Sequence, residues 1–457
     1  MAKKAVKKKT AKKKVAKNSF KSWFLKGLWS ITWKSALAFI AFMVIVGIYF
    51  DQKIERKLDG QTWNLPAQVY ARPLVLSVGE HASKQRVINE LKQLNYRAVK
   101  HVQGSGQFSV SGDKVNVYRR AFDFSDSMQY AKRFAIHFKN GQIKSINNAQ
   151  RQGVKAIRFE PLLLARLHSK NIEDRLFVPF EKIPSLFIDT LLLMEDRDYY
   201  HHQGVSPLAI LRAFITNMKA GHTVQGGSTL TQQLAKNMFL TRERSLWRKF
   251  QEAYIAVLLD HKYSKDRLLE AYLNELYLGQ NGKSAIYGIG LASDFYFARP
   301  ITELRVEQMA LLVAIIKGPS YYNPRRNPKR AQERRDLVLR LMVENNLINR
   351  AEYQYAVRDN LGIADKHALN YRSNPAFISL LNRELAVQVP ASVSKKSGLL
   401  IFTSIDPVSQ RYAEKAVYNG IKRVSKKGQT NLQGSMVITD RTRAEVRAIV
   451  AGKNVKF

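Results

Sequence analysis

The sequence predicts a multidomain α+β protein with an N-terminal transmembrane helix, a small α+β module, a mainly α-helical domain and the start of a further domain. Three observations lead to this fold class. The chain has 457 residues, more than one hydrophobic core usually organises. An uncharged apolar stretch follows a lysine-rich start. After it, the pattern changes from strand-like alternation to long helical periodicity and back.

The basic start of the chain leads directly into the apolar stretch. The first 26 residues hold 11 lysines and no acid, which is typical of nucleic-acid-binding tails and of segments beside anionic membranes. Residues 35–50 then run for 16 positions without a charge and, with the residues before them, reach the roughly 20 needed to cross a bilayer. No small-residue cleavage site follows, so we predict an uncleaved anchor rather than a signal peptide or a buried core helix. The lysines predict a cytoplasmic N-terminus, with the chain after residue 50 on the outside.

Residues 66–158 have the pattern of a small α+β module. Val87, Leu91 and Leu94 share one face of a predicted helix, and residues 106–120 and 134–148 alternate as strands, the latter around an Asn-Gly turn. No cluster of catalytic side chains is visible in this part of the sequence. We therefore expect a docking domain.

The following region, residues 160–350, is predicted to be mainly α-helical. Short Gly-rich or Pro-rich breaks separate its helical segments, which include residues 187–194, 230–239, 248–263, 265–278 and 306–318. Residues 351–398 are expected to form a linker. Residues 399–457 then show strand patterns and predict one more domain. The absence of cysteine excludes disulfides, thiolate zinc sites and cysteine nucleophiles.

Polar side chains crowd the end of one apolar helix. The sequence LFIDTLLLM leads into Glu195 and Asp196, and His202 and Gly204 follow shortly after. Such a change is typical of a catalytic cleft, but also of an ordinary helix C-terminus. His201 and His202 are adjacent and point in different directions on a helix, so they would chelate a metal poorly and no metal site is predicted.

Two further stretches of the helical region concentrate polar groups. The sequence GGSTLTQQLAKN, residues 226–237, combines paired glycines with hydroxyl, amide and amino groups. Arg248, Lys249 and Glu252 are three and four residues apart, which places them on one helical face. Each stretch has a simpler explanation, since Ser228 or Thr229 is also a typical helix cap and a charged triplet is often a solvated ion-pair face.

Taken together, the three stretches fit one reaction. A sugar hydroxyl attacks an anomeric carbon that carries a phosphate leaving group. One carboxylate must remove the hydroxyl proton, which requires a pKa raised towards neutrality by burial. Arginine and lysine must neutralise the departing phosphate. Because a membrane helix precedes these stretches, the phosphate is expected to belong to a lipid.

The chain resembles a known family in five motifs that occur in order. EDRDYYHHQG, GGSTLTQQLAKNMFL, RKFQEAY, YLNELYLG and IIKGPSYYNPRRNP, within residues 160–350, are similar to the peptidoglycan glycosyltransferase domain of class A penicillin-binding proteins. Residues 66–158 are similar to the accessory domain of the 1B type. The resemblance implies a lysozyme-like helical fold, an inner-membrane protein of single-pass type II with a periplasmic catalytic domain, and polymerisation of lipid II into β-1,4 glycan strands with inversion.

The resemblance also implies a role for each candidate residue. Glu195 falls on the general base, and Glu252 falls on a second carboxylate that assists departure of the lipid diphosphate, directly or through a divalent cation such as Mg²⁺ or Mn²⁺. Asp196 would orient the base or support its motif, and it is counted among the substrate-binding positions. The remaining positions are expected to bind substrate: Ser228, Thr229, Gln232, Gln233, Lys236, Asn237, Arg248, Lys249 and Lys317. The implied partners are lipid II, the growing glycan strand, the membrane and an outer-membrane lipoprotein activator at the accessory domain.

The family pattern continues into a transpeptidase domain that this chain is expected only to begin. Ser392 and Lys395 spell the serine–lysine motif of that domain, but residues 396–398 imitate a later motif directly beside it. Both are interpreted as accidental, with the catalytic serine expected beyond Phe457.

Three alternatives stay open. A lysozyme-like hydrolase shares the fold and a catalytic glutamate, but it does not need the cations. A second alternative is a non-catalytic membrane protein that only docks partners, and a third is nucleic-acid binding through the lysine tail. We also predict membrane contact beyond the anchor at Phe239, Leu240, Leu246 and Trp247, which lie among arginines.

Overall fold

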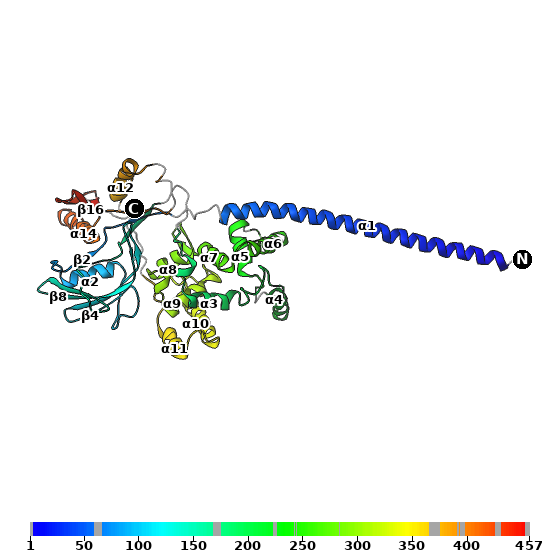
Figure 1. Cartoon of the computed structure of the whole chain (residues 1–457), viewed down its shortest axis with the longest axis horizontal. Helices are drawn as coiled ribbons and strands as arrows, with labels where there is room; N and C mark the ends of the chain where they lie inside the picture. Colours follow the sequence, from blue (N-terminus) through cyan, green and yellow to red (C-terminus); the bar gives the residue numbers. More distant parts are fainter. Residues whose placement is uncertain are drawn as a thin grey trace.

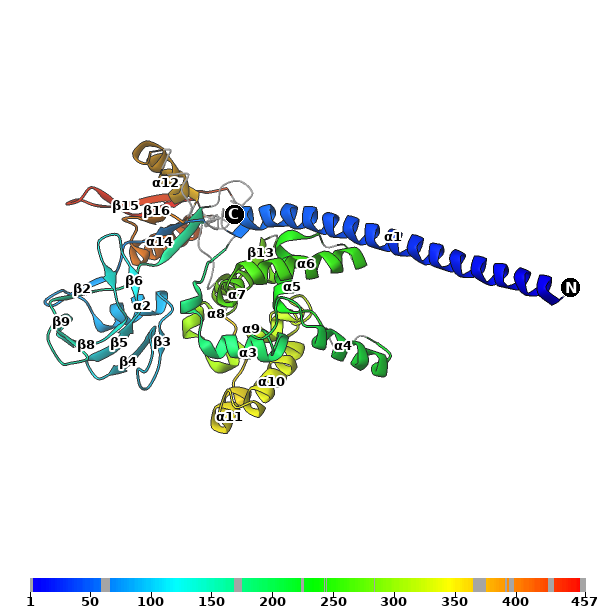
Figure 2. The same cartoon turned by 45° about the vertical axis from the view of Figure 1, so that its right-hand side comes forward.

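A computed structural model gives the arrangement of the chain, in which one long helix leads into a folded body (Figures 1 and 2). The residues that it describes are 3–58, 66–167, 175–222, 226–241, 243, 245–282, 284–364, 375–390, 393, 398–425 and 431–452. Within the first helix, side chains are described at Trp29 and from Thr32 onward.

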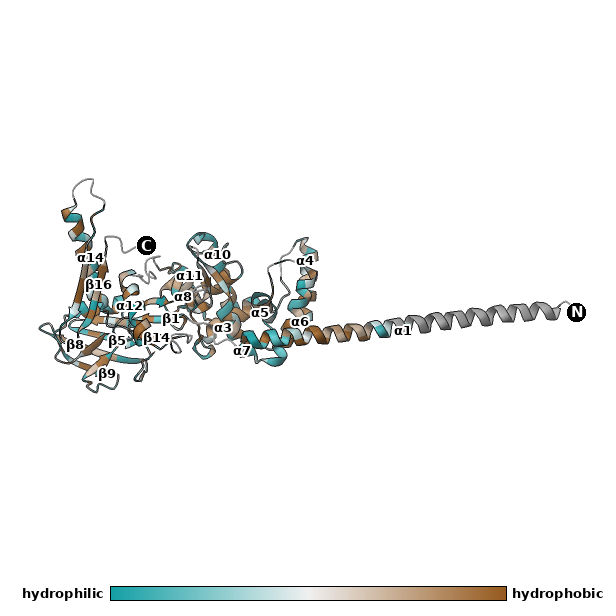
Figure 3. Cartoon of the chain, turned by 90° about the horizontal axis from the view of Figure 1, so that it is seen from above, coloured by the Kyte–Doolittle hydropathy of each residue, from teal (hydrophilic) through white to brown (hydrophobic). Residues whose placement is uncertain are grey.

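The helix α1 (Lys3–Leu58) contains the predicted anchor and also belongs to the folded body. Its segment Thr32–Leu58 is long and apolar enough to cross a membrane. Apolar side chains such as Phe39 and Ile45 are exposed there, in the brown part of α1 in Figure 3. The end of the helix differs, because Ile54 and its apolar neighbours are buried in the core of the helical domain.

Two lysines near the end of α1 bind the C-terminus of α5 (Leu230–Phe239), one of the helices of the site. Lys53 Nζ donates a hydrogen bond to the carbonyl oxygen of Phe239 at 2.9 Å, and Lys57 Nζ donates to that of Met238. Cations at a helix C-terminus satisfy carbonyls that have no partner within the helix. The end of α1 is therefore a structural part of the helical domain.

The predicted α+β module is built on a five-stranded sheet in the order β3-β4-β5-β8-β9. Its strands are β3 (Arg97–Ala98), β4 (Gln107–Ser111), β5 (Lys114–Arg119), β8 (Lys132–Lys139) and β9 (Gln142–Asn148). Helix α2 (Lys84–Gln93) buries Val87 and Leu91 in the same core. Asn140 and Gly141 both have positive φ, 50° and 73°, so the predicted Asn-Gly turn between β8 and β9 is confirmed.

Two short pairings complete the strands of this module, and a further sheet joins three distant parts of the chain. The two pairings are β2 (Val75–Ser77) with β10 (Ala156–Arg158), and β6 (Phe122–Asp123) with β7 (Met128–Gln129). In the three-stranded sheet, β1 (Ala67–Tyr70) lies between β11 (Leu163–Leu167), which is antiparallel to it, and β14 (Leu400–Phe402), which is parallel. Arg72 and Asp406 form an ion pair at 2.8 Å beside this sheet. The C-terminal segment is therefore held against the start of the module.

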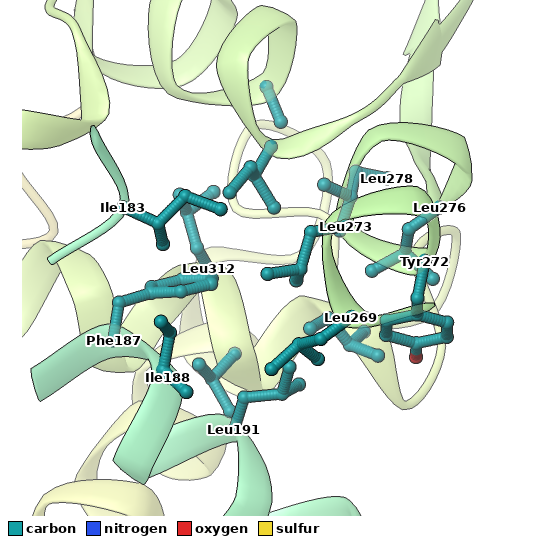
Figure 4. Packing of buried hydrophobic residues seen from close by; sticks show 14 of the residues in the cluster. Ile183, Phe187, Ile188, Leu191, Leu269, Tyr272, Leu273, Leu276, Leu278 and Leu312 are labelled. Atoms are coloured by element: carbon teal, nitrogen blue, oxygen red, sulfur yellow. The ribbon is translucent and has the colours of Figure 1, made fainter. Parts of the chain in front are cut away.

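The helical domain is packed around α9 (Val306–Ile316), which is buried at every position from Glu307 onward. Its other helices are η1 (Phe180–Lys182), α3 (Ser185–Glu195), α4 (Pro207–Ala220), α5, α6 (Leu246–Lys262), α7 (Lys265–Glu275), α8 (Ile289–Phe297), η2 (Ile301–Glu303), α10 (Pro328–Glu344) and α11 (Arg350–Arg358). Figure 4 shows Phe187 and Leu191 of α3 packed near Leu312 of α9 and Leu269 of α7. The same core continues to Ile363, past the expected boundary at 350.

One predicted helix, over residues 265–278, is partly wrong. α7 ends at Glu275, and the next residues form β12 (Tyr277–Asn281), which pairs with β13 (Ser284–Tyr287). Leu276 and Leu278 are buried on either side of a less buried tyrosine, so their spacing is the period of a strand. The chain then turns at Gly288, which has a φ of 78° and packs directly against the carbonyl of Asn274.

The C-terminal segment has the strands that its sequence predicts. It consists of α12 (Pro375–Gln388), β14, α14 (Pro407–Val424), β15 (Ser435–Asp440) and β16 (Glu445–Ala451). α14 packs Val417 and Ile421 onto the β15–β16 hairpin. The assignment of this segment to a transpeptidase domain stays a prediction. The serine–lysine motif at 392–395 lies outside the described residues, except for Val393.

Candidate active site

Glu195 is the last residue of α3, and the buried residues Phe187 and Leu191 fix that helix in the core. Its Oε2 accepts a hydrogen bond from Nε2 of Gln233 on α5 at 3.2 Å. Burial raises the pKa of Glu195, and the Gln233 hydrogen bond and the nearby charges of Arg334 and Lys317 offset part of this increase. A carboxyl group in such surroundings is suited to take up a proton near neutral pH.

The next residue, Asp196, is turned towards the framework of the site. Its Oδ2 accepts a hydrogen bond from the backbone N–H of Leu230 at 2.9 Å and lies 3.0 Å from Nε2 of His202. Leu230 is the first residue of α5, so this carboxylate binds the N-terminus of α5 to the end of α3. Asp196 therefore connects the end of α3, where Glu195 lies, to the start of α5, which carries Gln233.

Thr229 and Gln232 form the N-terminal cap of α5. They form a reciprocal capping box, and the Thr229 hydroxyl also donates to the carbonyl of Gly204 at 2.6 Å. Both residues are only 2% exposed. Their cap hydrogen bonds start the helix, and the role of both residues in substrate binding stays a prediction.

Glu252 lies inside α6 and is 2% exposed. Its Oε1 accepts from Nη1 of Arg248, and its Oε2 accepts from Nζ of Lys249 at 2.8 Å. Lys249 also donates to Oγ of Ser228 at 2.5 Å, so it links α6 to the loop before α5. The predicted charged face is confirmed: Glu252 is buried and bonds to both cations, while Lys249 itself is exposed.

Lys236 connects the two carboxylates electrostatically. It lies on α5, one helical turn after Gln233. Burial lowers its pKa, while the charges of Glu252 and, more weakly, Glu195 oppose that change. A partly buried ammonium group between two carboxylates is suited to bind an oxyanion that arrives with a substrate.

Two further predicted residues, Lys317 and Asn237, are more exposed than Glu195, Glu252 and Lys236. Lys317 follows α9 directly and is exposed, and its charge acts on Glu195. Asn237 is exposed on α5. The sequence interpretation did not single out Arg334 of α10 or Tyr272 of α7, although Arg334 acts on Glu195 and Tyr272 bonds to Gln233. Tyr272 opens the motif YLNELYLG, but neither residue's local spacing indicates a contact with the site, because both reach it through helix packing.

An exposed apolar rim lies on α4 and at the start of α6. It consists of Leu208, Leu211, Phe214 and Met218 on α4, and of Leu246 and Trp247 on α6. Leu246 is 90% exposed and Trp247 52% exposed, as the predicted membrane contact requires. The prediction is wrong for Phe239, which is 5% exposed and packs in the core at the end of α5.

The donor set does not fit a divalent cation held by the protein alone. Both oxygens of Glu252 already accept from cationic side chains, and a metal would have to displace them. Across the residues that the structure describes, no group of three or more His, Asp or Glu side chains is placed to hold a metal ion. The expected Mg²⁺ or Mn²⁺ near the lipid diphosphate stays a prediction.

Two family models match the chain. Residues 162–343 match the family described as transglycosylase, and residues 76–159 match the bifunctional transglycosylase second domain. The first range contains Glu195, Glu252 and the cations around them. The second range contains the five-stranded sheet and α2.

Relatives with these domains are similar over most of the chain. Penicillin-binding protein 1B of Vibrio cholerae is 46% identical over 95% of this chain and 56% of its own length. Penicillin-binding protein 1B of Escherichia coli strain K12 is 43% identical over 93% of this chain and 50% of its own length. The match to a crystal structure of penicillin-binding protein 1A from Haemophilus influenzae covers 62% of this chain and 32% of that chain, at 21% identity. Its TM-score of 0.27 is too low for a comparison of folds.

These matches are consistent along the sequence. The chain spans about half the length of the two curated 1B relatives named above, 56% of the Vibrio cholerae protein and 50% of the Escherichia coli protein. Within that span, the α+β module precedes the transglycosylase domain, and both follow the apolar helix. Over most of its length the chain is therefore similar to penicillin-binding proteins of the 1B type, and its residues 162–343 match the transglycosylase family.

Proposed function

We propose that this chain is a peptidoglycan glycosyltransferase that polymerises lipid II into β-1,4-linked glycan strands in cell wall synthesis. The observation that supports this most directly is the contrast between two carboxylates of one site. Burial raises the pKa of Glu195, whereas Glu252 is paired with Arg248 and Lys249. One is suited to proton transfer and the other to organising positive charge.

The proposed reaction is a single displacement. The oxygen of the acceptor 4-hydroxyl forms a bond to the anomeric carbon of the donor, and the hydroxyl proton passes to Glu195. The bond between that carbon and the diphosphate breaks, and its electron pair leaves on the diphosphate oxygen. Attack on the side opposite the leaving group inverts the configuration at the anomeric carbon.

The departing diphosphate needs positive charge close to Glu252. Lys236, Arg248 and Lys249 supply it, with Arg248 able to bind two oxygens at once and the lysines acting as point charges. Preorganised charges of this kind stabilise the transition state because they need no rearrangement during the reaction. Glu252 holds two of these cations in place before the substrate arrives.

The reaction is tested with labelled lipid II and the detergent-solubilised chain. Glycan product from the parent chain and none from Glu195→Gln would support the transfer and its base. If both folded proteins form no glycan, the non-catalytic docking function becomes the better account. Cleavage of preformed glycan without polymerisation would instead indicate a lysozyme-like hydrolase.

The membrane is proposed to hold both the protein and its lipid-linked substrate. α1 would anchor the chain in the bacterial inner membrane with its lysine-rich end in the cytoplasm and the catalytic domain in the periplasm, as a single-pass type II protein. The exposed apolar rim on α4 and α6 would insert its side chains into the periplasmic leaflet of the same membrane.

Vesicle binding tests the rim separately from the anchor. A chain without residues 1–42 keeps the part of α1 that packs in the core. In that chain, Leu246→Glu with Trp247→Glu should weaken binding to anionic vesicles about 100-fold or more, because the double variant loses the transfer free energy of two large apolar side chains. Val387→Glu, at an exposed position of α12, is the matched control. Unchanged binding of the rim variant would contradict the contact.

The α+β module is proposed to dock an outer-membrane lipoprotein activator. The match to the bifunctional transglycosylase second domain supports a role for this module that is distinct from catalysis. Residues 399–457 are proposed to begin a transpeptidase domain. Stimulation of glycan synthesis by a purified activator, and its loss when residues 66–158 are removed, would test the docking role.

A further inference from the structure

A tyrosine that the mechanism above does not use is connected to the base through one amide. Tyr272, on α7, is 1% exposed, and its hydroxyl donates to Oε1 of Gln233 at 3.1 Å. Gln233 in turn donates from Nε2 to Oε2 of Glu195 at 3.2 Å. In Figure 4, Tyr272 stands at the edge of the packed leucines, and its hydroxyl oxygen is the one polar atom of the labelled side chains.

The two hydrogen bonds together determine which way the Gln233 amide faces. An ionised carboxylate only accepts hydrogen bonds, so Glu195 requires the NH₂ end of the amide. Burial raises the pKa of Tyr272 well above its ordinary value, so the hydroxyl keeps its proton and can donate it to the amide oxygen. A glutamine with one such partner at each end has a single satisfied orientation.

This arrangement also distinguishes the two oxygens of the base. Oε2 is occupied by Gln233. Among the residues that the structure describes, no hydrogen bond reaches Oε1 of Glu195, so that oxygen is the one available to a substrate hydroxyl. We propose that Tyr272 is a positioning residue, which holds the Gln233 amide on Oε2 of Glu195 and so leaves Oε1 to take the proton of the acceptor hydroxyl.

This role rests on the proposed glycosyltransferase function and makes a specific prediction for Tyr272→Phe. Without the hydroxyl, the amide of Gln233 can rotate and turn its oxygen towards the carboxylate. The hydrogen bond from Gln233 lowers the pKa of Glu195, so its loss should raise that pKa. Because the base works when deprotonated, the acidic limb of the pH–rate profile should move to higher pH, with a rate about tenfold lower on the acidic side and a much smaller change at alkaline pH.

The experiment measures lipid II polymerisation against pH for the full chain and four variants. Tyr296→Phe is the matched control, because Tyr296 is equally buried and its hydroxyl bonds to the carbonyl of Leu278, away from Glu195. Its acidic limb should stay where that of the parent lies. Gln233→Leu breaks the same connection from the other side, so it should move the limb as Tyr272→Phe does, even if Tyr272→Phe folds poorly. The double variant Tyr272→Phe/Gln233→Leu should be no slower than Gln233→Leu alone.

Two results would overturn the role of Tyr272. One is a loss of rate by the same factor at every pH, and the other is an additive effect of the two substitutions. Failure of the proposed function is distinguishable, since the parent chain itself would then form no glycan at any pH.

Discussion

The surroundings of Glu195 and Glu252 differ although both glutamates belong to one site. Glu195 ends a helix, and its hydrogen-bond donor among the described residues is a neutral amide. Glu252 lies within a helix, is 2% exposed and accepts from two cations. The difference shows how one residue type acquires two roles. Burial beside a neutral amide favours proton uptake by Glu195, whereas Glu252 accepts from two cations and so orients them.

The helix α5 carries side chains that interact with both Glu195 and Glu252. Gln233 bonds to Glu195, and Lys236, one turn later, is under the influence of both carboxylates. Its N-terminus is bound by Asp196, and its C-terminus by Lys53 and Lys57 of the anchor helix. The relative position of the two carboxylates therefore depends on how firmly α5 is held.

The largest effect is expected from removing the base. Glu195→Gln should lower the rate of glycan formation by about 10²–10⁴-fold, the usual contribution of general acid–base catalysis. The measurement is single-turnover formation of glycan from labelled lipid II. Glu181→Gln, at an exposed position of η1, is the control and should retain the parent rate. A rate for Glu195→Gln within tenfold of the parent would remove Glu195 from the role of base.

Neutralising the second carboxylate should have a somewhat smaller effect of a different kind. Glu252→Gln should lower the rate by about 10²–10³-fold, because Arg248 and Lys249 lose the group that positions them for the diphosphate. The acidic limb of the pH–rate profile should stay in place, since Glu195 is intact. A shift of that limb in Glu252→Gln would mean that the two carboxylates share the proton-transfer role.

The packing between the two regions can be tested through Gly204. This residue has a φ of 79°, and a Cβ added there would lie 2.3 Å from the carbonyl oxygen of Ala256 on α6. Gly204→Ala should therefore lower the free energy of unfolding by about 3 kcal/mol or more, measured by thermal or denaturant unfolding. Gly112→Ala is the control, because Gly112 has a similar positive φ and open space around it. That variant should lose only about 1–2 kcal/mol.

The smallest expected effect is a pH-dependent gain in stability. The folded state raises the pKa of Glu195, so it binds this proton more tightly than the unfolded state does. The stability that Glu195 contributes is fully present below its unfolded pKa and is lost as pH rises through the folded pKa. Glutamine does not titrate, so Glu195→Gln should become more stable than the parent as pH rises. Each kcal/mol of unfolding free energy that the parent loses should appear as a Tm difference of about 2–4 °C. An equal Tm difference at all pH values would contradict the raised pKa.

Residues that are close in sequence were the most predictable part of the site. Arg248, Lys249 and Glu252 meet because their spacing matches the helical repeat. Ser228 and Thr229 were correctly considered as helix caps, and the structure assigns the cap to Thr229. The sequence also predicts the anchor, the order of the domains and the strands of the α+β module. Family resemblance, rather than local pattern, singled out Lys317.

Contacts between distant segments were not predictable in the same way. Tyr272 and Arg334 come from helices far along the chain from Glu195. Tyr272 begins the motif YLNELYLG, but the local sequence does not indicate that either residue reaches Glu195. The pairing of β1 with β11 and β14 unites residues near 67, 165 and 401. The burial of Phe239 was likewise missed, because one apolar residue among arginines can face either the core or a membrane.

The sequence by itself determined which residues could form helices and strands, and which charged groups would share one face. Hydrophobic periodicity and the short range of helical contacts make this possible. Only the tertiary structure decided that Glu195 would be desolvated beside an amide and Glu252 held between cations. A pKa depends on burial and on groups brought close by packing, and packing is set by the whole core rather than by any one segment.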